Sequence, residues 1–146
     1  MALATRSADV VWEGDLMKGR GKLDAGTGAF KNLAVSWKAR AEEAGGNTSP
    51  EELLAAAHAT CYAMALSNTI ASAGHTPERL EVHAEFDLDK ADPGVKITRV
   101  RLRVRGKVAG VDEAAFKDLA RKGEQGCPVS NAIRGNVDIS LDAGLI

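Results

Sequence analysis

Residues 50–70 read PEELLAAAHATCYAMALSNTI, and this stretch decides the fold. Its start is well signalled, because Ser49 can cap a helix, Pro50 suits the first helical position and Glu52 completes a Ser-x-x-Glu capping box. Apolar or small side chains occupy nearly every later position, and Gly74 supplies a C-terminal stop. The stretch therefore predicts one long helix, beginning at Pro50, that is apolar around most of its circumference.

A helix of this kind is too apolar for a single sheet, which covers only one face of it. We expect a symmetric partner helix and a second sheet to cover the other faces. The sequence therefore predicts an intimate homodimer.

Strand-like runs lie on both sides of this helix. Before it, glycine turns separate three such runs: ADVVWEGD (8–15), GKLDAGTG (21–28) and KNLAVSWKAR (31–40). After it, two alternating runs flank a turn and indicate a hairpin: RLEVHAEFDLDK (79–90) and VKITRVRLRVRGKVAG (95–110). The apolar phase changes within the last run, so we expect a bulge near Thr98 and Arg99.

This last run also carries a basic stripe. Its members, which would share one face of the strand, are Arg99, Arg101, Arg103 and Arg105. We interpret the stripe as the solvated face of an antiparallel sheet, balanced by acidic residues on the facing strand.

The rest of the chain adds two helices and a final strand. Residues 111–123, VDEAAFKDLARKG, are amphipathic and closed by Gly123, and Pro128 places Cys127 at or beside the N-cap of a short helix. Residues 136–144, NVDISLDAG, are typical of a strand. Because strands do not alternate with helices one by one, the pattern predicts an α+β fold with two antiparallel blocks.

Length and composition fit a single compact domain spanning residues 1–146. Hydrophobic residues make up 45% of the chain, and 20 acidic against 19 basic side chains give no electrostatic case for binding nucleic acid or a membrane. No run approaches the roughly 18 apolar residues of a membrane-spanning helix, and the N-terminal residues lack a long apolar core. We therefore expect a cytoplasmic location.

The chain has two cysteines, Cys61 and Cys127, whose separation excludes a local CxxC redox or zinc pair. One interpretation is that both are inert core thiols, because free cysteine is often buried. In the reactive reading, amide donors at the short helix start stabilise a Cys127 thiolate. Cys61 needs a cation or a hydrogen-bond donor from elsewhere, and arginine is the natural supplier because it stays charged in a dry pocket.

Four segments together resemble the OsmC/Ohr family of osmotically inducible and organic hydroperoxide resistance proteins. They are NTSPEELLAAAHATCYAMALS, GCPVS, WEGDLMKGRGKL and VSWKAR. The resemblance covers essentially the whole chain and is closer to the OsmC branch. It implies one OsmC-like domain over residues 1–146, with antiparallel sheets wrapped around long central helices in an intertwined homodimer that has its active sites at the interface.

The same resemblance implies a thiol peroxidase for stress defence that reduces organic hydroperoxides and, more weakly, hydrogen peroxide. It makes Cys61 the peroxide-attacking residue and Cys127 its disulfide partner. Glu51 matches the family's carboxylate and Arg40 its arginine, with the Lys18–Arg20 loop as the alternative source of the cation. No metal or prosthetic group is implied, and the expected partners are the hydroperoxide and a dithiol reductant, possibly of lipoyl type, rather than glutathione.

The helix geometry adds an inference about the dimer. Ten residues of continuous helix would separate Glu51 from Cys61 by about 15 Å along the axis, on different sides. These residues therefore cannot share a site within one chain, whereas a two-fold axis pairing antiparallel helices would bring Glu51 of one chain toward Cys61 of the other. Met64 and Ala65, one turn beyond the cysteine, would accept the alkyl part of the substrate.

Two other functions are open. His58, three residues before Cys61, suggests a Cys/His hydrolase, but no orienting Asn or Asp and no oxyanion turn accompany it, so a core or supporting histidine is the better interpretation. A redox-sensing dimer without turnover is the second alternative. His75 and His83 have no metal-site spacing and are expected at the surface.

Overall fold

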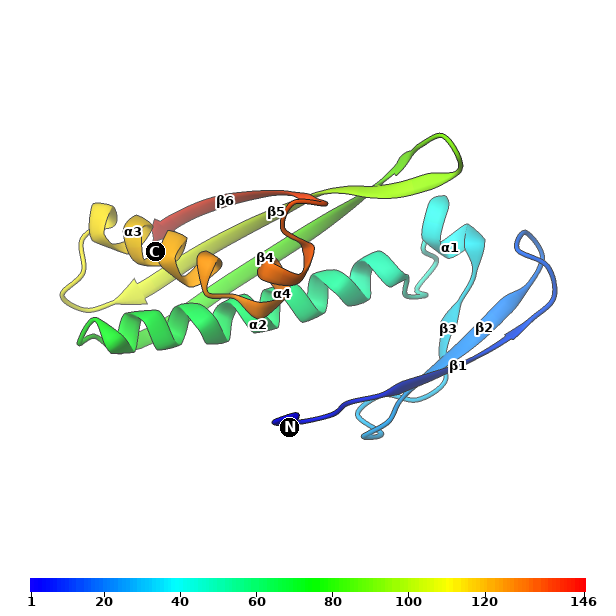
Figure 1. Ribbon diagram of the computed structural model, residues 1–146, viewed down its shortest axis with the longest axis horizontal. Coiled ribbons are helices and arrows are strands. Elements are labelled where there is room, and N and C mark those ends of the chain that lie inside the picture. The colour runs from blue at the N-terminus through cyan, green and yellow to red at the C-terminus, as the bar shows by residue number, and fades with distance from the viewer. The chain divides into compact units, whose positions relative to one another are not determined.

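The computed structural model describes residues 1–146, which form two compact units, Met1–Pro50 and Glu51–Ile146. The first unit contains β1 (Ala8–Glu13), β2 (Arg20–Ala25), β3 (Leu33–Val35) and α1 (Trp37–Ala41) (Figure 1). The second contains α2 (Pro50–Ser72, whose first residue closes the first unit), β4 (Pro77–Lys90), β5 (Val95–Val108), α3 (Glu113–Gln125), α4 (Pro128–Ile133) and β6 (Asp138–Leu145).

The N-terminal unit is an antiparallel meander in the order β1-β2-β3, which confirms the three predicted strands. Trp12 of β1 lies over Gly21 of β2, where an added Cβ would meet the indole at 2.9 Å. The third run was predicted as strand throughout, and this is wrong from Trp37 onward. Ser36 caps a short helix there by accepting a 3.1 Å hydrogen bond from the Ala39 amide.

The C-terminal unit has a three-stranded sheet in the order β4-β5-β6. β4 and β5 form the predicted hairpin. Asp87 pairs with Arg99 and Leu88 pairs with Ile97, so Thr98 is the extra residue of a bulge, as the change of apolar phase predicted.

β6 corrects the expectation of purely antiparallel sheets, because it pairs with β5 in parallel. A parallel neighbour needs a crossover, and α3 and α4 supply it between β5 and β6. The α+β class is confirmed, with one parallel pair in its second sheet.

Glycines position α3 differently from the prediction. The helix continues through Gly123 to Gln125. Gly126 is its C-cap residue, and the Gly126 N–H donates to the Lys122 carbonyl at 3.1 Å. Gly123 instead marks a close approach to α2, because a Cβ there would lie 3.0 Å from the Cα of Leu66.

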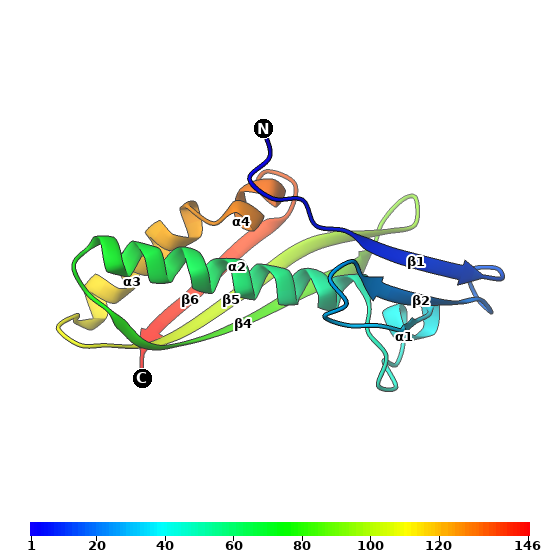
Figure 2. The ribbon, with the colours of Figure 1, turned by 90° about the horizontal axis from the view of Figure 1, so that it is seen from below.

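The long helix begins at Pro50 as predicted and ends before Gly74, whose φ is +89°. It lies along one face of the β4-β5-β6 sheet with α3 on the same side (Figures 1 and 2). Its buried positions follow helical spacing and include Tyr62, Leu66 and Ile70, whereas Met64 on another face is 68% exposed. The chain's own sheet thus covers one face of α2, as expected; the homodimer stays a prediction. No helix is both long and apolar enough to cross a membrane.

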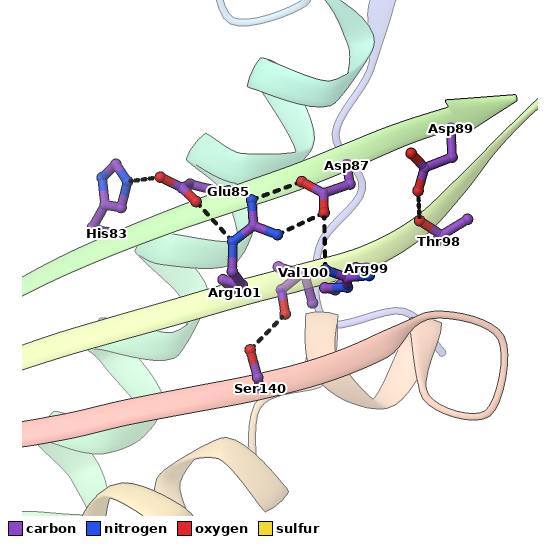
Figure 3. Close-up of polar contacts among 9 residues, drawn as sticks. All are labelled: His83, Glu85, Asp87, Asp89, Thr98, Arg99, Val100, Arg101 and Ser140. Carbon is purple, nitrogen blue, oxygen red and sulfur yellow. Dashed lines mark hydrogen bonds and ion pairs between the residues drawn. The ribbon is translucent and has the colours of Figure 1, made fainter.

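The opposite face of this sheet carries the arginines of β5, as predicted. Figure 3 shows Arg101 between two carboxylates: it donates to Asp87 at 2.6 and 2.7 Å and to Glu85 at 2.9 Å. His83 is exposed beside Glu85, at 3.1 Å. These pairs stand in solvent, so they orient side chains on the surface rather than form a site.

Candidate active site

The two cysteines meet where α2 contacts the start of α4. Cys61 lies in the fourth turn of α2, and Cys127 is the N-cap residue of α4. The Cys127 side chain lies close enough to Cys61 to affect the ionisation of its thiol, and neither cysteine is in a disulfide. Cys127 belongs to the buried core at 0% exposure, whereas Cys61 is partly exposed at its edge. Two residues 66 positions apart are thus neighbours within the C-terminal unit.

The first turn of α4 serves Cys61, which differs from the expectation that its amides would stabilise Cys127. The side chain of Cys127 makes no capping hydrogen bond. Instead, the backbone N–H of Val129 acts on the Cys61 sulfur and lowers the pKa of its thiol. First-turn amides have no partner inside their own helix, so they are available to a group on a neighbouring element. The donor that Cys61 lacks in α2 is therefore supplied by α4.

Burial dominates the ionisation of Cys61. It raises the pKa of the thiol above its ordinary value, the Val129 amide lowers the pKa by less, and the adjacent Cys127 thiol raises it further. The protonated thiol is therefore favoured in this surrounding, and a nearby positive charge is needed to make Cys61 a nucleophile at neutral pH.

A second buried contact joins the same two helices. His58 Nε2 lies 2.7 Å from Ser130 Oγ, and both side chains are 0% exposed. Burial lowers the pKa of His58, and the nearby Glu124 carboxylate raises it by less. The imidazole is therefore neutral near pH 7. Its Nδ1 has no hydrogen-bond partner, and its edge packs against the Phe86 ring at a centroid distance of 5.7 Å.

The hydrogen-bond partner of His58 argues against the Cys/His hydrolase. Because Nε2 is bound to Ser130 and Nδ1 is unpaired, the imidazole makes no hydrogen bond to Cys61. The Cys/His dyad lacks its defining contact. The prediction of a core or supporting histidine is confirmed by the burial of His58.

The far end of α4 is fastened to α3. Arg134 donates to the Glu124 carboxylate at 2.7 Å, and Glu124 is itself buried at 8% exposure. The Asn131 side-chain amide donates to the Gln125 carbonyl at 3.1 Å. The short helix that carries Cys127 is thus held at its C-terminal side by α3 and at its N-terminal side by α2.

The remaining predicted residues lie elsewhere. Glu51, 7% exposed, is in the first turn of α2, and the helix runs unbroken to Cys61, so the two are about 15 Å apart along the axis as expected. Arg40 lies on α1, with its guanidinium carbon 6.0 Å from the centroid of the Trp37 ring. Lys18 is exposed in the turn before β2, and Arg20 is exposed at the start of β2. The roles of all four stay predictions.

Val129 and Ser130 were not predicted as site residues. A signal existed: Pro128 fixes the helix start, which places Ser130 three residues after Cys127, just as Cys61 comes three residues after His58. Matching spacings on two helices permit paired contacts, but only the fold shows that the helices meet. No three His, Cys, Asp or Glu side chains lie close enough together to hold a metal ion.

Comparisons of the chain with known proteins all point to the same family. The model of the OsmC-like protein family matches residues 19–142. The chain is 38% identical over 131 residues to peroxiredoxin OsmC of Escherichia coli, covering 90% of each chain, and 36% identical over 102 residues to an organic hydroperoxide resistance protein of Xanthomonas axonopodis, covering 66% of this chain and 67% of the relative. A crystal structure of an organic hydroperoxide resistance protein OsmC from Legionella pneumophila superposes with a TM-score of 0.79 at 30% identity over 99% of both chains. The chain therefore belongs to the OsmC-like protein family.

Proposed function

We propose that the protein is a cysteine-based thiol peroxidase that reduces organic hydroperoxides and, more weakly, hydrogen peroxide. The observation that carries this proposal is the contact between the Cys61 and Cys127 thiols. An oxidised Cys61 would have its disulfide partner beside it. The relatives named peroxiredoxin OsmC and organic hydroperoxide resistance protein support the same chemistry.

The proposed reaction has three balanced steps. The Cys61 thiolate attacks the terminal peroxide oxygen, the O–O bond breaks, and the leaving alkoxide takes a proton to become an alcohol while Cys61 becomes a sulfenic acid. The Cys127 sulfur then attacks the sulfenic sulfur, which forms the disulfide and releases water. A dithiol, possibly of lipoyl type, reopens the disulfide by exchange and is itself oxidised to a cyclic disulfide.

Formation of the thiolate needs a cation beyond the C-terminal unit's own contacts. Burial and the Cys127 thiol raise the pKa of Cys61, and the Val129 amide only partly offsets them. We propose that Arg40 supplies the charge, oriented by Glu51, with Lys18 or Arg20 as the alternative source. No cofactor enters the scheme.

The proposed arrangement also requires a homodimer. About 15 Å of helix separates Glu51 from Cys61, so Glu51 would serve the Cys61 of a second copy. The exposed Met64 on α2 is consistent with an apolar surface that a second copy or an alkyl substrate covers. We propose a cytoplasmic role in defence against oxidative or osmotic stress.

A redox sensor without turnover is the second candidate. The burial of Cys127 and the raised pKa of Cys61 are also compatible with a thiol pair that responds slowly to oxidants.

Steady-state kinetics distinguishes the two candidates. Cumene hydroperoxide, tert-butyl hydroperoxide and hydrogen peroxide are each tested with dihydrolipoamide, dithiothreitol or glutathione. A peroxidase gives many turnovers with a dithiol, is fastest with the organic peroxides, and stalls after one turnover in Cys127→Ser. A single stoichiometric oxidation with every reductant would favour the sensor, and full activity in Cys61→Ser would contradict both.

A further inference from the structure

Two facing pairs of side chains lie between α2 and α4. Cys61 pairs with Cys127 and His58 pairs with Ser130, so the two residues on each helix are three positions apart. Side chains at this spacing lie on the same helix face, one turn from each other. The His58–Ser130 pair is therefore one turn away from the sulfur pair on both helices.

α4 depends on such contacts for its position. It has six residues, too few for an isolated helix to be stable in water. Arg134 and Asn131 tie its C-terminal side to the end of α3. Around the cysteines, the polar contacts to α2 come from Val129, whose amide acts on Cys61, and from Ser130, which pairs with His58.

The chemistry of the His58–Ser130 pair suits it to selecting one register. Apolar side chains can slide past one another at little cost, whereas a buried hydrogen bond is satisfied at only one distance and direction. The imidazole is neutral and its Nδ1 is unpaired, so Ser130 is its one hydrogen-bond partner. A shift of α4 would leave two buried polar side chains without partners.

We propose that His58 and Ser130 are positioning residues whose hydrogen bond sets the register of α4 on α2 and so holds the Val129 amide and the Cys127 thiol against Cys61. Neither residue touches the reacting atoms. Ser130 is fully buried, so the pair is not a serine hydrolase dyad. The effect on peroxide turnover rests on the proposed function, whereas the effect on the thiols does not.

The test measures the thiols without peroxide. In Ser130→Ala the Val129 amide no longer points at Cys61, so the thiolate absorbance of Cys61 should appear at higher pH and its alkylation by iodoacetamide at pH 7.5 should slow by at least about threefold. Diamide removes two hydrogens from the two thiols and is itself reduced to a hydrazine. Its rate of forming the Cys61–Cys127 disulfide should fall by at least about tenfold, because both sulfurs must meet in one geometry.

Two further variants make the result specific. His58→Gln has an amide that can bond Ser130. It should therefore keep most of the wild-type rates of alkylation and of disulfide formation. Ser140→Ala removes an exposed hydroxyl whose bond, 3.4 Å to the Val100 carbonyl, lies on the sheet, and it should change neither. Wild-type titration and disulfide rates in a folded Ser130→Ala would overturn the proposal, even if peroxidase activity is confirmed. Altered thiols in a protein without peroxidase activity would support it while the proposed function fails.

A further test uses the wild-type protein, so it does not depend on whether a variant folds. The Ser130 hydroxyl can donate to Nε2 or accept from it, so the bond is detected through the proton that it holds. The hydroxyl or ring proton between Oγ and Nε2 should exchange slowly enough with water to be observed by NMR at pH 7 to 8. An observable proton between the two side chains would support the proposal, and one that exchanges too fast to be seen would overturn it.

Discussion

The C-terminal unit carries two polar networks of opposite character. On the outer face of the sheet, Arg101 makes three short charged hydrogen bonds with Glu85 and Asp87 (Figure 3). Between α2 and α4, neutral groups make a single 2.7 Å bond, His58 to Ser130, beside the sulfur pair. The first network is stronger by geometry and charge, yet solvent screens it. The second is buried, where a lost partner is not replaced by water. Burial, rather than the number of contacts, should decide which network matters.

The largest difference between the two networks is expected in activity. Cys61→Ser should lower kcat/KM for cumene hydroperoxide by at least about a thousandfold, because a hydroxyl is a far weaker nucleophile than a thiolate. Arg101→Gln should leave the value within about twofold, as for most surface substitutions. Steady-state assays with dithiothreitol measure both. A comparable loss in both variants would remove the distinction between the networks.

The packing around the buried network gives the next largest effect. Gly123→Ala places a Cβ 3.0 Å from the Leu66 Cα, which is backbone and cannot swing away, so unfolding in urea should show a loss of about 1–3 kcal/mol. Gly126→Ala is the matched control, since its φ is −88° and the nearest atom would lie 3.6 Å from the new Cβ. It should be close to neutral. Equal losses would mean that α3 does not approach α2 this closely.

The hydrogen bond itself should contribute less than the packing. Ser130→Ala leaves the buried His58 without a partner and should cost roughly 1–2 kcal/mol in the free energy of unfolding. Thr98→Ala, which removes an exposed hydroxyl bonded to Asp89, provides the comparison and should have little effect. Denaturant midpoints with unchanged slopes measure both variants. An effect of Thr98→Ala as large as that of Ser130→Ala would show that burial is not the deciding factor.

The smallest effect is a pH dependence of stability. Burial lowers the pKa of His58 below its usual 6.5 in the folded state. The unfolded chain therefore binds a proton first, and the free energy of unfolding should fall as pH drops below about 6.5, until the folded-state pKa is passed. Urea midpoints at pH 7.5, 6.5 and 5.5 test this. His58→Gln should flatten the decline, whereas His83→Gln, at an exposed site, should preserve it. A decline of unchanged steepness in His58→Gln would assign it to other groups, including Glu124, which faces His58.

The parts of the fold that the sequence predicted are those with local signals. Pro50 and Gly74 bound α2 as expected, and the phase change in β5 located the bulge at Thr98. Helix α1 was missed because five residues give little periodicity, and Ser36 was not recognised as its cap. The parallel direction of β6 was missed because an alternating run does not specify which way its strand points.

In the candidate site, too, the features with local sequence signals were predicted and the contacts between distant residues were not. The sequence and the family resemblance selected both cysteines, and the N-cap position of Cys127 followed from Pro128. The first-turn amides of α4 were assigned to Cys127, whereas the Val129 amide acts on Cys61, because the direction of a first-turn N–H depends on the helix packed against it. The His58–Ser130 bond joins residues 72 positions apart, and no local pattern specifies that contact.

Cys61 and Cys127 should form one redox pair within a single chain. Mass spectrometry of reduced protein after one equivalent of cumene hydroperoxide tests it most directly. The intact chain should lose two hydrogens, with the Cys61 and Cys127 peptides joined, whereas Cys127→Ser should gain one oxygen at Cys61. An unchanged mass, or disulfides that link different chains only, would contradict it.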